Sequence, residues 1–350
     1  MDSVNLRNKK TVKRLLDNLA NATPGTLDQC LSEAYHGNAE WRGSHPMNTA
    51  TGLEAIKEKV WSPLINSFPD LERRDNIILG GNFKNNDLVG MMGHYAGTFT
   101  NDWFGIPATG GLIYLRYGEI HQVVNGKIAQ SSVLVDVLDV IRQAGFWPFA
   151  PSLGSNEMWA APITGDGWLL HETDRAQSEE TLALTLAMHH SLGADPDNAT
   201  DNGFKVEREA LLNMSQKEYW HSKMMWYGPC GIGTSRGLPG FVDLHQRPFR
   251  LAFPERRSGG ANHYCKIGDA NYSLTAGWPS VIAKHAGSGW LGLPATNRMI
   301  NMRVMDFYLI DEGLIRENWV PIDILDILLQ MEVDVLARVR QQFKKPMQFE

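Results

Sequence analysis

The chain contains an internal repeat, and this repeat constrains the fold more than any other feature of the sequence. Matching residues fall 185 positions apart in the earlier part of the repeat: His36 and His221, Trp41 and Trp226, and Gly43 and Gly228. The offset becomes 187 further on, where W-F-G-I-P-A-T at 103–109 matches W-L-G-L-P-A-T at 290–296. So many matches at nearly one offset predict two copies of one module, each about 130–145 residues long.

The repeat divides the chain into three parts. We expect a first domain over residues 1–146, a connector over 147–177 and a second domain over 178–350, with a loop insertion rich in Asp and Asn at about 194–207. The connector carries three Trp and three Pro residues and is too apolar for a flexible linker. We expect an ordered strap packed on a module surface, and a lid over one pocket is the alternative.

Each module has helical patterns first and extended patterns after them. Apolar residues recur with a helical period in 11–20 and 27–35, and in 179–192 and 214–220 of the second copy; a third helix over 53–68 ends before Pro69. Strand-like runs follow at 73–79, 87–98, 111–123 and 127–135, with an Asn125-Gly126 hairpin signal before the last run. This order predicts an α+β module in which helices cover one face of an antiparallel sheet.

Composition and missing motifs narrow the function. The net charge of −6 and the pI near 6.0 argue against nucleic-acid binding, and no apolar run approaches the ~18 residues of a membrane span. Three scattered cysteines and no secretory pattern favour a cytoplasmic location. The sequence has no dinucleotide, P-loop, zinc-protease or hydrolase-elbow motif, so we expect neither a nucleotide nor a metal cofactor.

Three segments of the first module carry a family resemblance. They are W-F-G-I-P-A-T-G at 103–110, N-G-K-I at 125–128 and D-V-L-D-V-I-R-Q-A-G at 136–145. With them, the chain resembles the SnoaL-like polyketide cyclases of the nuclear transport factor two-like superfamily. The resemblance implies tandem cone-shaped α+β barrels, each a curved antiparallel sheet wrapped around three helices, with a pocket for a small apolar or aromatic molecule. It also implies a sheet face that forms dimers. Two fused modules would then pair within one chain, and pairing between two chains is the alternative.

The chain departs from the family at the reacting positions. The resemblance places a general acid/base carboxylate seven residues after the Gly of G-K-I, where this chain has Val133 and Val320. Valine transfers no proton. The position seven residues before that Gly holds a His in the family, and here it is Glu119 in the first copy and Asp306 in the second. Both modules therefore replace one proton-transfer group and place an acid at another position.

The acids have polar neighbours on the inward sheet face. Strand alternation puts Tyr117, Glu119 and His121 on one face. The second copy places Asp306 and Tyr308 there, with Asn318 on the neighbouring strand at the position of Ser131. Burial in an apolar cone raises the pKa of a carboxyl group and makes it a base near neutral pH. The alternative is that Glu119 pairs with His121 or an Arg and only satisfies a polar core.

These residues give the predicted sites. We expect Glu119 to act as the base of the first module, oriented by His121 and Tyr117, and Asp306 to be its counterpart, helped by Asn318 and Tyr308. Trp41, Trp226 and Ser131 would contact the ligand, with core packing as the alternative for the tryptophans. Other polar residues have structural interpretations: Asp136 and Asp323 as helix N-caps, and Arg116 and Arg303 on the opposite face of the sheet.

The leading functional hypothesis is a cofactor-independent enzyme that moves a proton on a small carbonyl-bearing molecule, by cyclisation, isomerisation or dehydration. The first module is the preferred site because it has three titratable groups on one strand face. A non-catalytic binding or carrier protein is the alternative, since the family acid is replaced. A third reading has one catalytic module and one structural module.

Overall fold

The computed structural model describes residues 2–193, 206–258 and 262–342. Most of the expected insertion at 194–207 lies outside the described residues.

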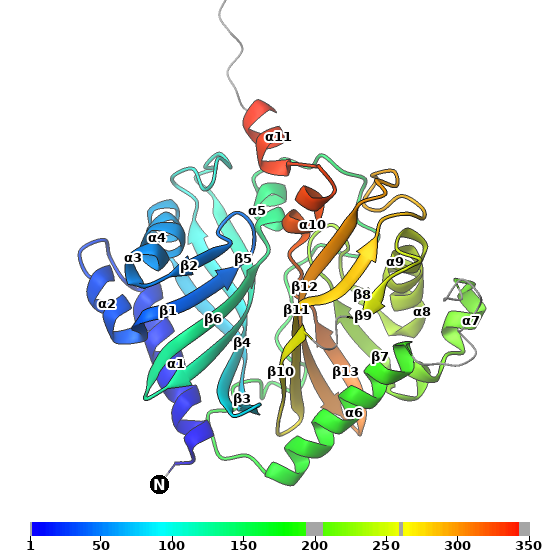
Figure 1. Cartoon of the computed structure of the whole chain (residues 1–350), viewed down its shortest axis with the longest axis horizontal. Coiled ribbons are helices and arrows are strands. Elements are labelled where there is room, and N and C mark those ends of the chain that lie inside the picture. The colour runs from blue at the N-terminus through cyan, green and yellow to red at the C-terminus, as the bar shows by residue number, and fades with distance from the viewer. Residues whose placement is uncertain (1, 194–205, 259–261, 343–350) are drawn as a thin grey trace, which may run out of the picture.

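Figure 1 shows two modules side by side, the first in blue to cyan and the second in green to red. Their elements follow the same order. The first module has α1 (Val4–Ala20), α2 (Leu27–Ala34), β1 (Tyr35–Gly43), β2 (Thr49–Thr51), α3 (Leu53–Ile56), π-helical η1 (Lys57–Trp61), α4 (Ser62–Ser67), β3 (Glu72–Phe83), β4 (Asn86–Thr98), β5 (Leu112–Val124), β6 (Lys127–Val135) and α5 (Val137–Gln143).

The second module follows the connector. It has α6 (Arg175–Gly193), α7 (Arg208–Leu212), η3 (Ser215–Glu218), β7 (Trp220–Tyr227), β8 (Ser235–Arg236), α8 (Gly237–Phe241), π-helical η4 (Val242–Gln246), α9 (Arg247–Ala252), β9 (Arg257–Ser258), β10 (His263–Asp269), β11 (Tyr272–Lys284), β12 (Met299–Asp311), β13 (Leu314–Trp319), α10 (Ile324–Gln330) and α11 (Val335–Gln342). The π-helical turn recurs at the same place in both modules, in the helix between the short strand and the long ones.

Each module has one open, curved sheet. The strand orders are β2-β1-β6-β5-β4-β3 and β10-β11-β12-β13-β7-β8, with β9 pairing with β11. The expected α+β cone is confirmed, but the sheets are mixed and do not close into barrels. Among the described strands, β1–β6 and β7–β13 pair in parallel and the other neighbours pair antiparallel. In each module the first strand, β1 or β7, lies beside the last long strand, β6 or β13, and runs in the same direction.

Local expectations succeeded where the signal was strong. The Asn125-Gly126 turn joins β5 to β6 with positive φ at both residues, as the predicted hairpin requires. The expected helix at 214–220 is wrong, because a short 3-10 turn at 215–218 leads directly into β7. The sequence also gave no strand at β1. Both strands have two consecutive exposed residues at their third and fourth positions, which interrupts the period-two pattern.

The two sheets pack against each other through their outer faces. One buried cluster joins Ile120 and Met92 of the first sheet to Phe307 and Leu274 of the second. Glycine permits the close approach: a Cβ at Gly90 would lie 2.2 Å from Leu274 Cδ2. A buried ion pair between Lys9 and Asp269, 2.7 Å apart, also joins the modules.

A matched pair of polar contacts crosses between the modules. The Asp136 carboxylate caps α5 and accepts a hydrogen bond from the backbone N–H of Cys230, at 2.8 Å. The Asp323 carboxylate caps α10 and accepts one from the N–H of His45, at 3.0 Å. Positions 45 and 230 correspond in the repeat, so the two contacts are related by the internal symmetry. Both predicted N-caps are confirmed.

The arginines predicted on the outer face pair with these caps. Arg116 lies 3.3 Å from Asp136 and donates to the connector carbonyl of Asn156. Arg303 lies 2.8 Å from Asp323 and reaches the carbonyl of Gly43 in the other module. Both arginines therefore lie where the two modules and the connector meet.

The segment after each capped helix reaches over the other module. Ala150 of the connector packs at Gly292, where an added Cβ would lie 2.8 Å from the Ala150 Cβ. Arg340 of α11 packs at Gly105, the repeat counterpart of Gly292, where an added Cβ would lie 2.9 Å from Arg340 Cδ. The connector is otherwise ordered along both sheets: the Trp159 indole is buried and donates to the carbonyl of Gly228. The domain boundaries at 146 and 177 stay predictions.

Candidate functional site

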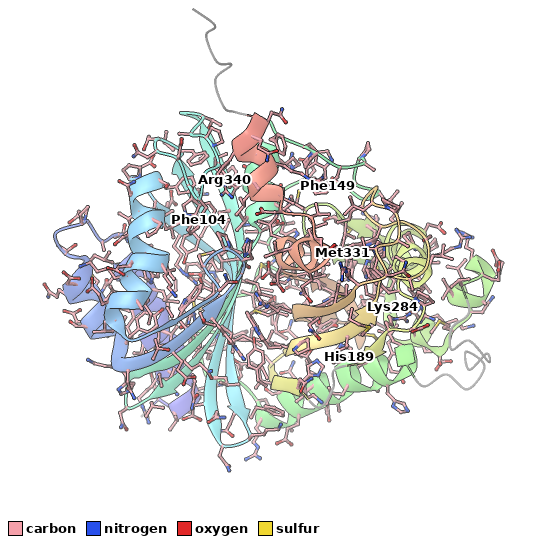
Figure 2. All side chains as sticks on the ribbon, turned by 45° about the horizontal axis from the view of Figure 1, so that its top comes forward. Phe104, Phe149, His189, Lys284, Met331 and Arg340 are labelled. Atoms are coloured by element: carbon pink, nitrogen blue, oxygen red, sulfur yellow. The ribbon has the colours of Figure 1, made fainter. Side chains whose placement is uncertain are left out.

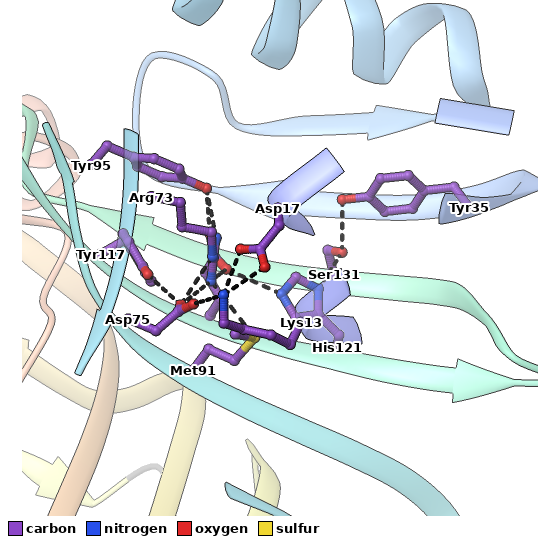
Figure 3. Close-up of polar contacts among 11 residues, drawn as sticks. Lys13, Asp17, Tyr35, Arg73, Asp75, Met91, Tyr95, Tyr117, His121 and Ser131 are labelled. Atoms are coloured by element: carbon purple, nitrogen blue, oxygen red, sulfur yellow. Dashed lines mark hydrogen bonds and ion pairs between the residues drawn. The ribbon is translucent and has the colours of Figure 1, made fainter. Parts of the chain in front are cut away.

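The first cone holds a buried ionic network around one arginine (Figure 3). Arg73 Nη2 lies 2.8 Å from both Asp75 Oδ1 and Glu119 Oε2, and Nη1 donates to the Tyr95 hydroxyl at 2.8 Å. Lys13 of α1 adds a second cation 3.3 Å from Asp75 Oδ2. The Arg73 and Asp75 side chains are almost completely inaccessible to solvent. Each buried charge therefore has an opposite charge beside it, which is the condition for burying ions at tolerable cost.

The predicted residues of the first module belong to this network. Tyr117 donates a hydrogen bond to Asp75 Oδ1 at 2.5 Å. His121 lies 3.3 Å from Glu119 Oε2 through Nε2 and 2.8 Å from Ser131 Oγ through Nδ1. The strand alternation that grouped these residues on one face is confirmed by these contacts, and Arg73 and Asp75 join them from β3.

The pairing changes the acidity of Glu119. Burial alone would raise the pKa of this carboxyl group, but the Arg73 guanidinium and the hydrogen bond from His121 outweigh burial and lower the pKa to about 2. The expected rise is therefore wrong for Glu119. A carboxylate this acidic accepts protons poorly near neutral pH. The structural alternative, in which Glu119 pairs with an Arg and His121, matches the contacts.

Little space remains inside the first cone. The cavity there has a volume of about 30 Å³ and is lined on the polar side by Glu119 and His121 and on the apolar side by Trp41 and Trp61. A cavity of this size accommodates only about two water molecules. Trp41 thus lies beside the predicted acid, as expected, but its large side chain is part of what fills the cone.

The second cone places a row of polar side chains on its inner face. Cross-strand partners in register share a face, so Trp226, Asn318, Tyr308 and Ser273 follow one another across β7, β13, β12 and β11. Asp306 lies two residues before Tyr308 on the same face. The repeat counterparts of Trp226, Asn318, Tyr308 and Asp306 are Trp41, Ser131, His121 and Glu119. The second site therefore corresponds to the first, with different groups.

Asp306 has neutral neighbours. Burial raises its pKa to about 7, and hydrogen bonds from Tyr308 and Asn318 oppose this rise only in part. The predicted rise is confirmed for this residue. Burial and the adjacent Asp306 raise the pKa of Tyr308 well above its usual value, so the phenol stays protonated. No ion pair to Asp306 occurs among the described residues. The group can therefore exchange a proton near neutral pH.

A histidine from α6 completes this group. His189 Nε2 lies 2.7 Å from the Tyr308 hydroxyl, and Figure 2 shows the residue on the helix beside the second sheet. Burial lowers the pKa of His189 to about 4, so the imidazole is neutral at physiological pH. One arrangement satisfies all three groups: the His189 Nε2–H donates to the Tyr308 oxygen, and Tyr308 donates to Asp306.

One buried hydroxyl near Asp306 has no partner. Thr275 lies directly opposite Asp306 in the β11–β12 pair and is completely buried. Its Oγ1 has no hydrogen-bond partner among the described residues. A buried hydroxyl without a partner is costly, and it is free to bind a group that enters the cone. The counterpart in the first module is Met91, opposite Glu119.

Aromatic side chains continue from this row onto α8, η4 and α9. The Trp226 ring stacks on His245 with ring centroids 3.9 Å apart and an interplanar angle of 16°. His245 also packs against Phe241 and Phe249. Burial, together with Arg256, lowers the pKa of His245 to about 3, so this ring is also neutral. The counterpart of His245 in the first module is Val60, which lines the small cavity there.

Several residues of these sites were missed from the sequence. Arg73 and Asp75 alternate at the start of an expected strand, and this spacing could have placed both on the inner face. His189 was considered only as one of two adjacent histidines. The helical phase of α6 would have separated the two, since His189 is partly buried and His190 is exposed. Thr275 and His245 carried no sequence signal.

Two further findings concern ligands and membranes. In the ranges that the structure describes, no group of three or more His, Cys, Asp or Glu side chains is placed to hold a metal ion. None of the helices described is both long and apolar enough to span a bilayer.

Comparison with known families supports the resemblance seen in the sequence. Residues 10–144 match the model of the SnoaL-like polyketide cyclase family. The first module is thus similar to a SnoaL-like polyketide cyclase domain over these residues. The second module has the same order of elements and the same sheet connectivity, so the chain carries this fold twice. The comparison with curated proteins gives no match.

The solved structures that are similar to this chain each match a part of it about as long as one module. A SnoaL-like protein from Jannaschia sp. CCS1 is 18% identical, covers 42% of this chain and 98% of its own, and has a TM-score of 0.36. IdmH from Streptomyces antibioticus is 20% identical, with coverages of 40% and 99% and a TM-score of 0.33. TsrD from Streptomyces laurentii is 20% identical, with coverages of 39% and 96% and a TM-score of 0.31.

Proposed function

We propose that the second module is a cofactor-independent proton-transfer site for a small apolar or aromatic molecule with a carbonyl group. The observation that carries the proposal is the contrast between two matched acids. Asp306 has only neutral hydrogen-bonding neighbours and a pKa raised to about 7, whereas Glu119 is paired with Arg73 and has a pKa lowered to about 2. A catalytic base is most effective when its pKa is near the working pH.

In this proposal, the ionised Asp306 carboxylate removes a proton from the carbon next to the substrate carbonyl. The electron pair of that C–H bond moves into a C–C double bond, and negative charge develops on the carbonyl oxygen. The Thr275 hydroxyl lies across the strand pair from Asp306 and is free to donate a hydrogen bond to that oxygen. Protonated Asp306 then returns the proton to the same or another carbon, which gives exchange or isomerisation. Cyclisation or dehydration would start from the same anion.

The neighbours of Asp306 keep the base in place. Tyr308 and Asn318 hold the carboxyl group by hydrogen bonds, and His189 holds Tyr308. Because both His189 and Tyr308 stay neutral, they orient the carboxylate and lower its pKa less than a nearby arginine would.

We propose a structural role for the first module. Its cone is nearly filled, and its outer sheet face packs on the second sheet as a partner subunit would. The fusion would then supply within one chain the dimer partner that the resemblance implies. A catalytic role of Glu119 and His121 stays a prediction that the same experiment tests.

The test measures the exchange of the α-protons of 2-tetralone in D2O by proton NMR, with wild type, Asp306→Asn and Glu119→Gln. The wild type should accelerate exchange over buffer. Asp306→Asn should reduce the acceleration about 100-fold or more, because the amide accepts no proton. Glu119→Gln should affect exchange less than Asp306→Asn does.

Three results would contradict the proposal. Loss of exchange in Glu119→Gln with exchange retained in Asp306→Asn would assign the chemistry to the first cone. Exchange retained in both variants would exclude both acids. Binding of 2-tetralone without acceleration of exchange would favour the carrier alternative. Circular dichroism of each variant separates loss of chemistry from loss of fold.

A further inference from the structure

A second cavity, called the outer cavity here, lies between the connector and the second module. It has a volume of about 180 Å³. Connector residues Ala150, Pro151 and Leu153 form one side, and Leu244, His245 and Trp290 of the second module form the other. A cavity of about 150 Å³ is large enough to bind benzene. The volume therefore suits one six-membered ring.

One lining residue of the cavity, His245, contacts the row of side chains that includes the proposed reaction site. His245 lines the cavity and stacks on Trp226, which is in register with Asn318 in the row that includes Tyr308. In the first module, the counterparts of these residues line one cavity together: Val60, Trp41, Glu119 and His121 all contact the same space. In the second module only His245 of these counterparts lines the outer cavity, so a ligand held at Asp306 would reach this cavity by passing Trp226 and His245.

The chemistry of the wall defines what the cavity accepts. His245 is neutral because burial and Arg256 hold its pKa near 3, so the wall presents aromatic and aliphatic surface without a formal charge. Aromatic rings pack against such surfaces in stacked or edge-to-face contact.

We propose that the outer cavity binds a second ring of the ligand, and that connector residues 150–153 together with His245 and Leu244 set the ligand's size. The connector thereby acts as a specificity element for the second module. The statement that the second ring is fused or linked to a carbonyl-bearing part of the ligand rests on the proposed function. The statement that the cavity binds an aromatic ring does not depend on that function.

The matched internal symmetry offers a control for this proposal. Leu244→Trp places an indole in the cavity from the second module, and Ala150→Phe fills it from the connector. Lys59 is the repeat counterpart of Leu244 and lines neither the small cavity of the first cone nor the outer cavity. Lys59→Trp adds the same indole to the first module and is the control.

The experiment measures binding of 2-naphthol by quenching of tryptophan fluorescence, and α-proton exchange of 2-tetralone and of cyclohexanone. Both filling variants should weaken 2-naphthol binding about tenfold or more, the range expected when one ring loses its pocket. They should lower kcat/KM for two-ring 2-tetralone by a similar factor while leaving one-ring cyclohexanone within about twofold. Lys59→Trp should leave 2-naphthol binding unchanged.

The two proposals fail in different ways. If 2-naphthol binds and the filling variants weaken its binding, but no variant or wild type accelerates exchange, the ring cavity stands and the proton-transfer function falls. If 2-naphthol binds both filling variants as tightly as wild type, or does not bind wild type at about 1 mM, the ring cavity is overturned. An equal loss in Lys59→Trp would also overturn it. Because the two fillings enter from different elements, misfolding of one variant leaves the other as the test.

Discussion

The two cones of this protein have the same fold and opposite electrostatic solutions for a buried acid. In the first, Arg73 and Lys13 lie beside Asp75 and Glu119, and the lowered pKa of Glu119 keeps that carboxylate ionised. In the second, Asp306 has only hydrogen-bonding neighbours without charge. A matched position on a matched strand therefore gives an anchored anion in one module and a titratable acid in the other. The neighbours of a carboxyl group decide its chemistry, and the fold alone does not.

The volumes of the cones follow the same division. The aromatic and ionic groups of the first cone leave about 30 Å³, whereas a cavity of about 180 Å³ lies between the second module and the connector. A fully paired ionic network also resists rearrangement, because each member loses its partner if it moves. These properties suit the structural role proposed for the first module, and the raised pKa of Asp306 suits the proton transfer proposed for the second.

The largest effect should come from breaking the charge network of the first cone. Arg73→Leu would leave Asp75 and Glu119 buried with less positive charge beside them. We expect the free energy of unfolding to fall by about 3–5 kcal/mol, as for other buried pairs that lose one partner. Urea denaturation followed by tryptophan fluorescence measures the change.

The matched change in the second cone is Tyr308→Phe, which removes a neutral hydroxyl. It should cost about 1 kcal/mol, because only hydrogen bonds are lost. Equal costs for Arg73→Leu and Tyr308→Phe would contradict the division between an ionic and a neutral cone.

The next effect concerns pH. The base form of Asp306 is the ionised one, so proton exchange should rise about tenfold per pH unit below 7 and level off above it, given a pKa near 7. His189 and His245 have lowered pKa values and Tyr308 a raised one, so these groups should stay neutral across pH 5–9. A pH series of 2-tetralone exchange measures the midpoint.

The first cone predicts a different pH response. Glu119 has a lowered pKa, so its stabilising ion pair is present above the usual carboxyl range and should be lost only as the pH falls toward 2.

For the second cone, a 2-tetralone exchange rate that levels off near pH 4 rather than near 7 would argue that a group other than Asp306 is the base.

The smallest effect should come from the unpartnered hydroxyl. Thr275→Val removes Oγ1 and keeps the shape, so exchange of 2-tetralone should fall about tenfold while the free energy of unfolding changes by less than about 1 kcal/mol. Thr275→Ser keeps the hydroxyl and should retain most of the rate. Full activity of Thr275→Val would mean that another group binds the developing negative charge.

The sequence by itself determined the architecture of this protein. The 185- and 187-residue offsets identified two modules, strong signals such as Asn125-Gly126 located turns, and strand alternation grouped Tyr117 with Glu119 and Asp306 with Tyr308. These inferences depend on local periodicity, which the chain carries along its length. They could not predict which of the two acids, Glu119 or Asp306, has a pKa near neutral pH, because the residues that shift these pKa values come from distant elements.

Only the tertiary structure decided which acid is titratable. Arg73 reaches Glu119 from β3, 46 positions away, and His189 reaches Tyr308 from α6, 119 positions away. The outer cavity likewise forms only where the folded connector lies over the second module. A pKa depends on the charge and burial supplied by all groups within a few ångströms, and the folded chain alone brings these groups together.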